Sequence, residues 1–308
     1  MSKLFIVGNG FDIDLGFSTR YSNFADCDQL WPFKSDATGL AGYLVRQRDT
    51  EKWLDIEQCL LDYALVKGGV VSSGQIKQHS LEDDKKSFEK LTKKLSQFIQ
   101  VVVERQKINK DSIAAKVLKA ISENGEYKVY TFNYTDINSF AERVGAKKMD
   151  CVHVHGSTKD DSIILGVDAK NDVIEGYDFL YKVYDPFYQS NTLRHDLEEA
   201  EEVVIFGHSL GPVDYSYFQT FFRNLCREEN TANDRKKVTI FTYDDDSRLD
   251  ILRQLRVMNN KEMQLMFNNN DFQIICTDYC DLRDKDRFEK FLKHLQETPF
   301  VGLGSAVL

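Results

Sequence analysis

The chain has 308 residues, of which 42% are hydrophobic and 29% charged, with only four prolines. This composition excludes a disordered chain and is sufficient for one large domain or two ordinary ones with a sizeable core. The net charge of −9 disfavours nucleic acid as a partner, because an acidic surface repels phosphates.

The sequence carries no targeting or membrane-spanning pattern. The apolar run within "MSKLFIVGNG" is too short for a signal peptide, and no stretch approaches the roughly 18 apolar residues of a membrane span. Six scattered cysteines include no C-x-x-C pair, so a zinc ribbon is not expected and free thiols are. We therefore expect a cytoplasmic protein without a membrane partner.

Short apolar runs that end in small or polar residues predict strands buried on both faces. They are Lys3–Val7, Tyr127–Phe132, Asp150–Val154, Ile163–Leu165, Glu202–Phe206, Lys237–Tyr243 and Phe272–Cys276. Apolar stripes at three- and four-residue spacing predict helices over about 88–102, 113–121, 217–225 and 288–295, the third capped by Asp214. This alternation predicts an α/β fold: a Rossmann-like, mostly parallel sheet flanked by helices.

The region after the first strand departs from this alternation. From about Leu30 to Gly125 the sequence contains no convincing strand, although a parallel crossover needs only a dozen or so residues. We predict a single domain over 1–308 that contains a helical insertion subdomain at 30–125.

Polar residues gather where four of the predicted strands end. Because parallel strands present their carboxyl ends at one edge of a sheet, these clusters should converge where such sheets bind ligands. The clusters are Gly8-Asn9-Gly10-Phe11-Asp12, Asn133-Tyr134-Thr135-Asp136, His153-Val154-His155-Gly156-Ser157 and Gly207-His208-Ser209.

The first cluster suggests a phosphate contact. Gly8 and Gly10 allow the backbone to approach an anion and point N–H groups at it, although Ile13 replaces the third glycine of the dinucleotide fingerprint. A plain tight turn is the alternative. Asp12 either contacts ribose hydroxyls or caps the next turn.

The histidine cluster suggests acid–base chemistry. Side chains alternate along a strand, so His153 and His155 should face the same side, but no spacing supplies a third ligand for a metal ion. His155, beside Gly156, is the better candidate for a general base, with a satisfied structural histidine as the alternative. Asn133 can hold a water or an amide, and it also suits a strand-end turn.

The string Gly207-His208-Ser209-Leu210-Gly211 fits G-x-S-x-G, the elbow that presents a serine nucleophile. A triad then needs an acid and a histidine later in the chain. The only later histidine, His294, lies in a helical stripe and points off its apolar face, and Gly211-Pro212-Val213 delays the next helix. A serine hydrolase with Ser209 as nucleophile is therefore the weaker alternative.

Together the motifs resemble the AbiH family of bacterial phage abortive-infection proteins. The matching blocks are "LFIVGNGFDIDLGFSTRYSNF", "WLDIE" at 53–57, "TFNYTD", "HVHGS", "ILGVD" and "FGHSLGPVDYSYF". That family is in turn similar to sirtuin-like NAD-binding domains. By this resemblance Gly8 and Gly10, with Asn9 and Asp12 beside them, match the turn around the cofactor diphosphate.

The resemblance also implies a catalytic pair. Asn133 matches the asparagine that positions ribose and water, and His155 matches the histidine that serves as catalytic base. Gly207, His208 and Ser209 match a segment that contacts the cofactor. The ribose-contact aspartate has no direct counterpart, although Asp136 lies nearby, and the four-cysteine zinc ribbon of deacylases is absent.

These departures make protein deacylation unexpected and favour hydrolysis of NAD to nicotinamide and ADP-ribose, without a metal. The resemblance implies an anti-phage effector that stays inactive until homo-oligomer assembly or a phage-derived trigger acts. From its length alone, we expect the 30–125 insertion to be the site of that control. A non-catalytic sensor of NAD or a related nucleotide is the main alternative. A nuclease is disfavoured by the acidic charge.

Overall fold

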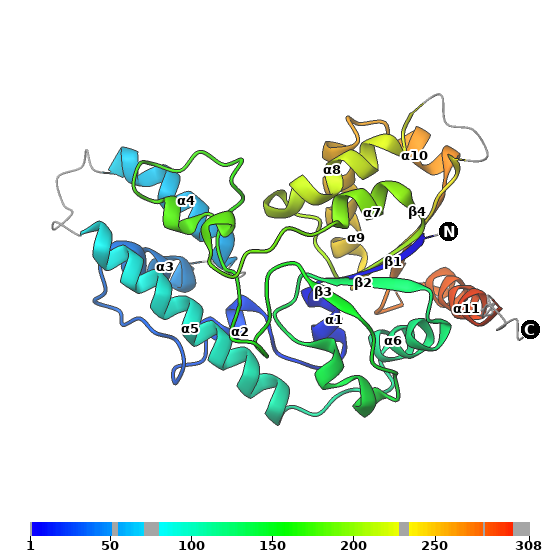
Figure 1. Cartoon of the computed structure of the whole chain (residues 1–308), viewed down its shortest axis with the longest axis horizontal. Coiled ribbons are helices and arrows are strands. Elements are labelled where there is room, and N and C mark those ends of the chain that lie inside the picture. The colour runs from blue at the N-terminus through cyan, green and yellow to red at the C-terminus, as the bar shows by residue number, and fades with distance from the viewer. Residues whose placement is uncertain (1, 51–54, 71–79, 228–233, 280, 298–308) are drawn as a thin grey trace, which may run out of the picture.

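The computed structural model describes residues 2–50, 55–70, 80–227, 234–279 and 281–297. Within these residues six parallel strands form one sheet in the order β3-β2-β1-β4-β5-β6 (Figure 1). The strands are β1 Ser2–Val7, β2 Tyr127–Thr131, β3 Cys151–His153, β4 Ala200–Phe206, β5 Lys237–Thr242 and β6 Asp271–Cys276. The predicted Rossmann-like parallel sheet is confirmed.

One predicted strand is wrong. Ile163–Leu165 is buried, but it forms no strand among the described residues. Ile164 donates its N–H to the carbonyl of His155, at 2.8 Å, within a connection that folds back over the end of β3. A short apolar run indicates that its residues are buried but not that they form a strand. Here the residues are buried because the loop packs against the rest of the domain.

Helices cover both faces of the sheet. They are α1 Asn9–Asp14, α2 Tyr21–Ala25, α3 Gly39–Thr50, α4 Ile56–Val70, α5 Leu81–Arg105, α6 Ile113–Asn124, α7 Leu193–Glu199, α8 Tyr215–Asn224, α9 Asp245–Met258, α10 Met263–Asn269 and α11 Leu282–Glu297. The short 3-10 helices are η2 Ile137–Ser139, η3 Ala141–Val144, η4 Asp178–Leu180, η5 Lys182–Tyr184 and η6 Pro212–Asp214.

The alternation of side chains along β1 explains why the strands are apolar throughout. Phe5 and Val7 belong to one hydrophobic cluster, with side chains of α1, α6 and α11. Leu4 and Ile6 belong to the other, with side chains of α7, α8 and α9. Each face therefore needs its own apolar residues, as expected for a parallel sheet covered on both sides.

The described part of the segment between β1 and β2 contains helices, turns and loops but no strand. The helices α3, α4 and α5 pack on one another to one side of the sheet (Figure 1), and their buried side chains continue the first cluster. Helix α6 instead packs against β2 and α11, as a crossover helix does. The domain boundaries themselves stay a prediction, and residues 53–54 of "WLDIE" lie outside the described residues.

Two further expectations concern cysteines and membranes. The five cysteines within the described ranges are free thiols, and Cys280 lies outside them. Among the described helices, none combines the length and the apolar character needed to cross a bilayer.

Candidate functional site

The strand order reverses between β1 and β4, and this switch point is where open α/β sheets bind ligands. Two backbone segments touch there. Gly8 donates its N–H to Phe206 O at 2.9 Å, and Gly10 donates to Gly207 O at 2.8 Å. The two N–H groups expected to face a phosphate are thus already bonded to β4 and the residue that follows it.

Steric contact explains the glycines at this point. A Cβ on Gly8 would lie 2.6 Å from His208 Cα, and one on Gly10 would lie 2.7 Å from Gly207 Cα. Gly207 has φ +64°, and a Cβ there would lie 2.4 Å from Phe11 N. The glycines allow close packing of β1 and β4 at their carboxyl ends, a function that the sequence pattern does not separate from anion binding.

Asn133, at the end of β2, ties this turn to a buried carboxyl group. Its Nδ2 donates to Gly8 O at 3.0 Å and to Asp12 Oδ1 at 2.9 Å, while Thr135 Oγ1 donates to Asp12 Oδ2 at 2.8 Å. Asp12 is 1% exposed. Burial raises the pKa of Asp12 to about 7, against the lowering effect of the Thr135 and Asn133 hydrogen bonds.

In a second cluster, Asp214 bridges two histidines. Asp214 Oδ1 lies 3.1 Å from His155 Nε2, and its Oδ2 lies 3.3 Å from His208 Nε2. His208 Nδ1 accepts the N–H of Leu210 at 2.9 Å, so the proton of His208 sits on Nε2 and points at Asp214. The Asp214 carboxylate thus connects His155, in the segment after β3, with His208, in the segment after β4.

His155 is suited to act as a base by its neutral state. It is 5% exposed. Burial and the Lys182 ammonium lower the pKa of His155 to about 4, although Asp214 opposes them. The pKa of Asp214 lies well below its usual value: burial raises it, but Lys182 and the two histidines outweigh burial. Because this carboxylate can only accept, we assign the proton of His155 to Nε2, which leaves the Nδ1 lone pair as the basic site.

Lys182 and Glu57 extend this cluster to the helical segment. Lys182 Nζ lies 2.9 Å from Glu57 Oε1, 3.3 Å from His155 Nε2 and 4.0 Å from Asp214 Oδ1. Burial lowers the pKa of Lys182, but Glu57 and Asp214 raise it further, so the net pKa is above the usual value. Burial raises the pKa of Glu57 to about 7, although Lys182 opposes this.

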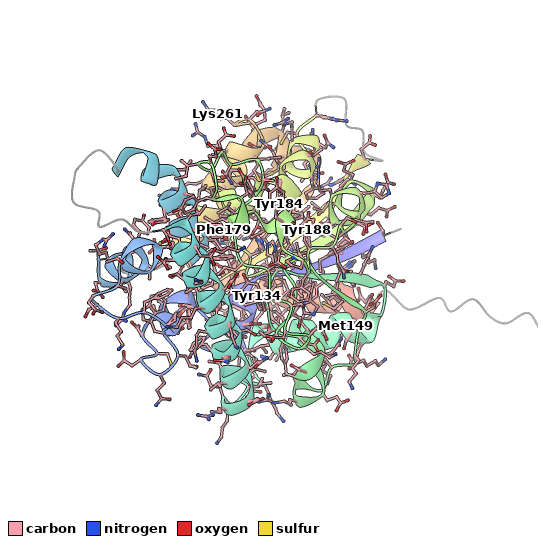
Figure 2. The ribbon with its side chains drawn as sticks, turned by 60° about the vertical axis from the view of Figure 1, so that its left-hand side comes forward. Tyr134, Met149, Phe179, Tyr184, Tyr188 and Lys261 are labelled. Atoms are coloured by element: carbon pink, nitrogen blue, oxygen red, sulfur yellow. The ribbon has the colours of Figure 1, made fainter. Side chains whose placement is uncertain are left out.

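Aromatic rings enclose the two histidines. The Phe132 ring lies 5.2 Å from the His155 ring and 4.3 Å from the His208 ring, between centroids, and Tyr217 packs on Phe132 at 5.5 Å. The connection that carries Lys182 also carries Tyr184, which is 64% exposed, and Tyr188; both side chains are labelled in Figure 2. The imidazoles thus pack against aromatic rings on one side and contact the charged groups of the cluster on the other.

Other predicted site residues have different surroundings. Asn9 is exposed, and its Oδ1 accepts the Thr19 hydroxyl at 2.6 Å. Asp136 caps η2 by accepting the N–H of Asn138 at 3.0 Å, and it pairs with Lys159 at 3.3 Å.

Strand β3 ends at His153, so the alternation that predicted a shared side does not reach His155. Burial lowers the pKa of His153, while the nearby carboxylates of Asp136 and Asp160 raise it. These are not the groups that surround His155, so the structure gives the two histidines different environments. Among the described residues, no three His, Cys, Asp or Glu side chains are grouped to hold a metal ion.

The geometry of "GHSLG" differs from a nucleophile elbow. Ser209 is exposed, and its Oγ accepts the Gly211 N–H at 3.3 Å. The strained residue is Leu210, with φ 52°, whereas an elbow places the serine itself on the strained turn. His294 pairs with Glu202 at 3.0 Å, and Glu202 lies near the amino end of β4. A triad of Ser209 with His294 is therefore excluded by position.

Sequence reasoning missed three members of the cluster. Asp214 occupies the predicted N-cap position of α8, but its side chain makes no capping hydrogen bond and turns to the histidines. Lys182 and Glu57 stand alone as charges within the runs "FLYKVY" and "IEQCLL". A charge inside an apolar run was the available signal, because a buried charge requires a partner.

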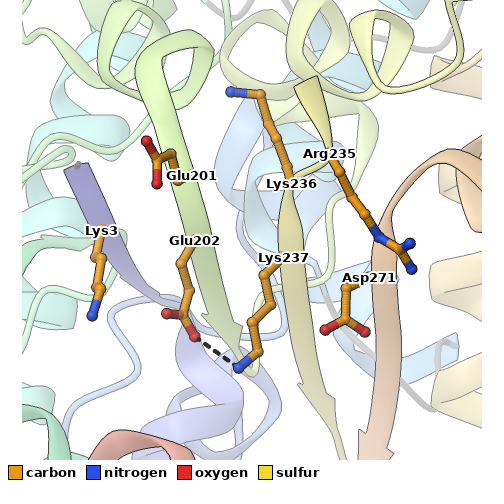
Figure 3. Close-up of a pocket in the computed structure, with 7 residues that line it drawn as sticks. All are labelled: Lys3, Glu201, Glu202, Arg235, Lys236, Lys237 and Asp271. Atoms are coloured by element: carbon orange, nitrogen blue, oxygen red, sulfur yellow. Dashed lines mark ion pairs between the residues drawn. The ribbon is translucent and has the colours of Figure 1, made fainter. Parts of the chain in front are cut away.

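A pocket of about 420 Å³ lies at the opposite edge of the sheet (Figure 3). It is lined by Lys3, Glu201, Glu202, Arg235, Lys236, Lys237 and Asp271. These residues stand at the amino ends of their strands, and Lys237 pairs with Glu202 at 3.5 Å. Ligands of this fold bind at the carboxyl ends, so we place the candidate site at the histidine cluster.

The chain matches the family model described as "Bacteriophage abortive infection AbiH" over residues 4–234. Searches of curated proteins and of solved structures found no match. The matched range contains both polar clusters, the glycine contact at the switch point and the helical segment between β1 and β2. It covers well over half of the sequence, and the chain therefore belongs to the AbiH family of bacteriophage abortive-infection proteins.

Proposed function

We propose that this AbiH protein is an abortive-infection effector that hydrolyses NAD to nicotinamide and ADP-ribose, with His155 as the base. The observation that carries the proposal is the His155 imidazole, which is buried, neutral and held by the Asp214 carboxylate at the carboxyl edge of the sheet. A base of this kind must be neutral at the working pH, and an orienting carboxylate fixes its tautomer.

The proposed reaction breaks the bond between ribose C1′ and the nicotinamide nitrogen. Nicotinamide leaves as a neutral molecule, water adds to C1′, and the proton of that water passes to His155 Nδ1 and then to solvent. Asn133 has its Nδ2 committed to Gly8 and Asp12, so its Oδ1 is the atom proposed to orient the water or a ribose hydroxyl. No metal takes part in this scheme.

The first test is nicotinamide release from NAD by the purified protein and by the protein from phage-infected cells. We expect His155→Ala to reduce turnover by about 10²–10⁴-fold, the usual contribution of a positioned base. His195→Ala is the matched control, because His195 is exposed on α7. Full turnover by His155→Ala, or none by the wild type from infected cells, contradicts the proposal.

Ser209 separates this chemistry from a serine hydrolase. As a contact to the dinucleotide, Ser209→Ala should raise KM for NAD about two- to tenfold, the value of one hydrogen bond, with kcat unchanged. A nucleophile would instead lose kcat entirely, and a fluorophosphonate probe would label it. Steady-state kinetics on this variant therefore decide between the two roles.

A nucleotide sensor without turnover is the second candidate. It is favoured by the burial of both His155 and Asn133 and by the carbonyl partners of the Gly8 and Gly10 N–H groups. Calorimetric binding of NAD without nicotinamide release, persisting in protein from infected cells, would support this candidate over the enzyme.

A further inference from the structure

Five ionisable side chains from five separate segments meet at the histidine cluster. Glu57 comes from α4, Lys182 from η5 and Asp214 from η6, while the two histidines follow β3 and β4. Lys182 is 5% exposed and lies between the carboxylate of Glu57 and the imidazole of His155. The ion pair therefore connects the segment between β1 and β2 directly to the proposed base.

Stability alone gives little reason to keep such a pair. Removing two charges from water costs several kcal/mol per ion, and replacing a buried pair by neutral residues of similar volume is often neutral or stabilising. Lys182 and Glu57 are both buried. An ion pair kept buried in contact with His155 points to a task beyond packing.

The geometry indicates what that task is. The titratable groups that face His155 are Asp214, Lys182, His208 and Tyr217. The Lys182 ammonium disfavours a second proton on the imidazole, and Asp214 takes the hydrogen bond from Nε2. If Lys182 lost Glu57, its closest remaining carboxylate in the cluster would be Asp214, 4.0 Å away, and it would compete with His155 for that carboxylate.

We propose that Lys182 and Glu57 are positioning residues for His155, and that α4 thereby supplies an essential part of the site from outside the sheet. Lys182 adds to the effect of burial in disfavouring a second proton on the imidazole, and Glu57 holds Lys182 away from Asp214. The meaning of this arrangement for catalysis rests on the proposed NAD hydrolysis, but the effect on the imidazole does not.

The test follows the His155 imidazole by NMR in protein with ¹³C-labelled histidine, with the resonance assigned by its loss in His155→Gln. The central variant is the double substitution Glu57→Gln with Lys182→Met, which removes both members of the ion pair and leaves Asp214 the hydrogen bonds of His155 and His208 as its partners. Each single variant leaves a buried charge without its partner, so the double variant is the one that decides.

In the double variant we expect the pKa of His155 to rise by at least about one pH unit, because a cation in contact has been removed. We expect turnover of NAD to fall at least about tenfold through kcat, since the ion pair that positions the groups around His155 has been removed. Lys182→Arg retains the cation and should keep the wild-type titration. A circular-dichroism melt should show that the double variant is folded.

The matched control removes another pair of charges at a buried carboxylate. Arg248 pairs with the fully buried Asp284 between α9 and α11, away from the cluster. Arg248→Met with Asp284→Asn should leave the His155 titration and turnover unchanged.

A wild-type titration and wild-type turnover in the Glu57→Gln/Lys182→Met protein would overturn the inference and reduce the pair to a packing role. The titration decides the inference even if the wild type does not hydrolyse NAD. Absence of turnover in every activated preparation would defeat only the proposed function.

Discussion

The carboxyl group of Asp12 is buried, and two side chains donate hydrogen bonds to it. Its pKa is raised to about 7, above that of an exposed aspartate, so the folded protein binds this proton more tightly than the unfolded chain does. The direction of the pH dependence of stability follows from this difference in proton affinity. The contribution of Asp12 to stability is complete below pH 4 and is lost as the pH rises from about 4 to 7.

Asp12→Asn should therefore remove this pH dependence. The amide can still accept from Asn133 and can donate to the Thr135 hydroxyl, so the contacts survive. Between pH 4 and pH 8 the unfolding free energy of the variant should gain roughly 2–4 kcal/mol on that of the wild type. Urea titrations of both proteins at the two pH values measure the difference.

A constant difference between the two proteins would show that Asp12 is ionised in the fold. The comparison is needed because His155 acts in the opposite direction: its pKa is lowered to about 4, so its contribution is lost as the pH falls from about 6.5 to 4. Because both proteins contain His155, the difference between their unfolding free energies reports the contribution of Asp12 alone.

The sequence predicted the positions of single residues better than their partners. His155 and His208 were placed at strand ends, but their shared partner Asp214 was interpreted as a helix cap. An aspartate before a helix fits either role, because cap geometry depends on a rotamer that the sequence does not encode. Asp136 shows the reverse case, since it was a candidate ligand contact and it caps η2.

At the scale of elements, the contact between β1 and β4 depends on glycine. Gly207 combines a left-handed φ of +64° with a backbone neighbour 2.4 Å from where a Cβ would stand. Gly145 has a similar φ of +75°, but nothing lies within 4 Å of its added Cβ. Both positions carry the strain of a left-handed backbone. Only Gly207 has neighbouring atoms where an added Cβ would lie.

Gly145→Ala should cost about 1 kcal/mol of unfolding free energy from the left-handed backbone alone. Gly207→Ala should cost at least about 2 kcal/mol more, because β1 and β4 must separate. Equilibrium unfolding in urea gives both values. Equal losses of unfolding free energy would mean that β1 and β4 separate without an energetic penalty. Close packing would then not explain the glycines, and an anion contact would be the remaining explanation.

The elements themselves were largely predictable, because two-sided burial makes β1, β4 and β5 apolar throughout and amphipathic stripes mark the helices. The error at Ile163–Leu165 arose because a three-residue run carries no periodicity. The segment between β1 and β2 was predicted to be helical from the absence of strands. Its contribution of Glu57 to the site was not predictable, since no local pattern brings α4 next to Lys182.

At the scale of the whole molecule, both polar clusters lie at the carboxyl ends of one parallel sheet, while the pocket at the amino ends is lined by charged residues of both signs. Family membership gives the abortive-infection role, and the histidine cluster supports a reaction at the carboxyl edge. Under the proposed function, a base positioned by α4 would make activity depend on how that helix is arranged against the sheet.

The hydrophobic cluster that runs from Phe5 and Val7 through α1 into α3, α4 and α5 has a consequence for cooperativity. Helices that share side-chain packing with a sheet cannot melt as a separate unit without exposing that face of the sheet. Differential scanning calorimetry should show one transition, with the calorimetric enthalpy equal to the van't Hoff enthalpy. Two resolved peaks would reveal an independent folding unit. Helix α4 could then unfold and leave His155 while the sheet stays folded.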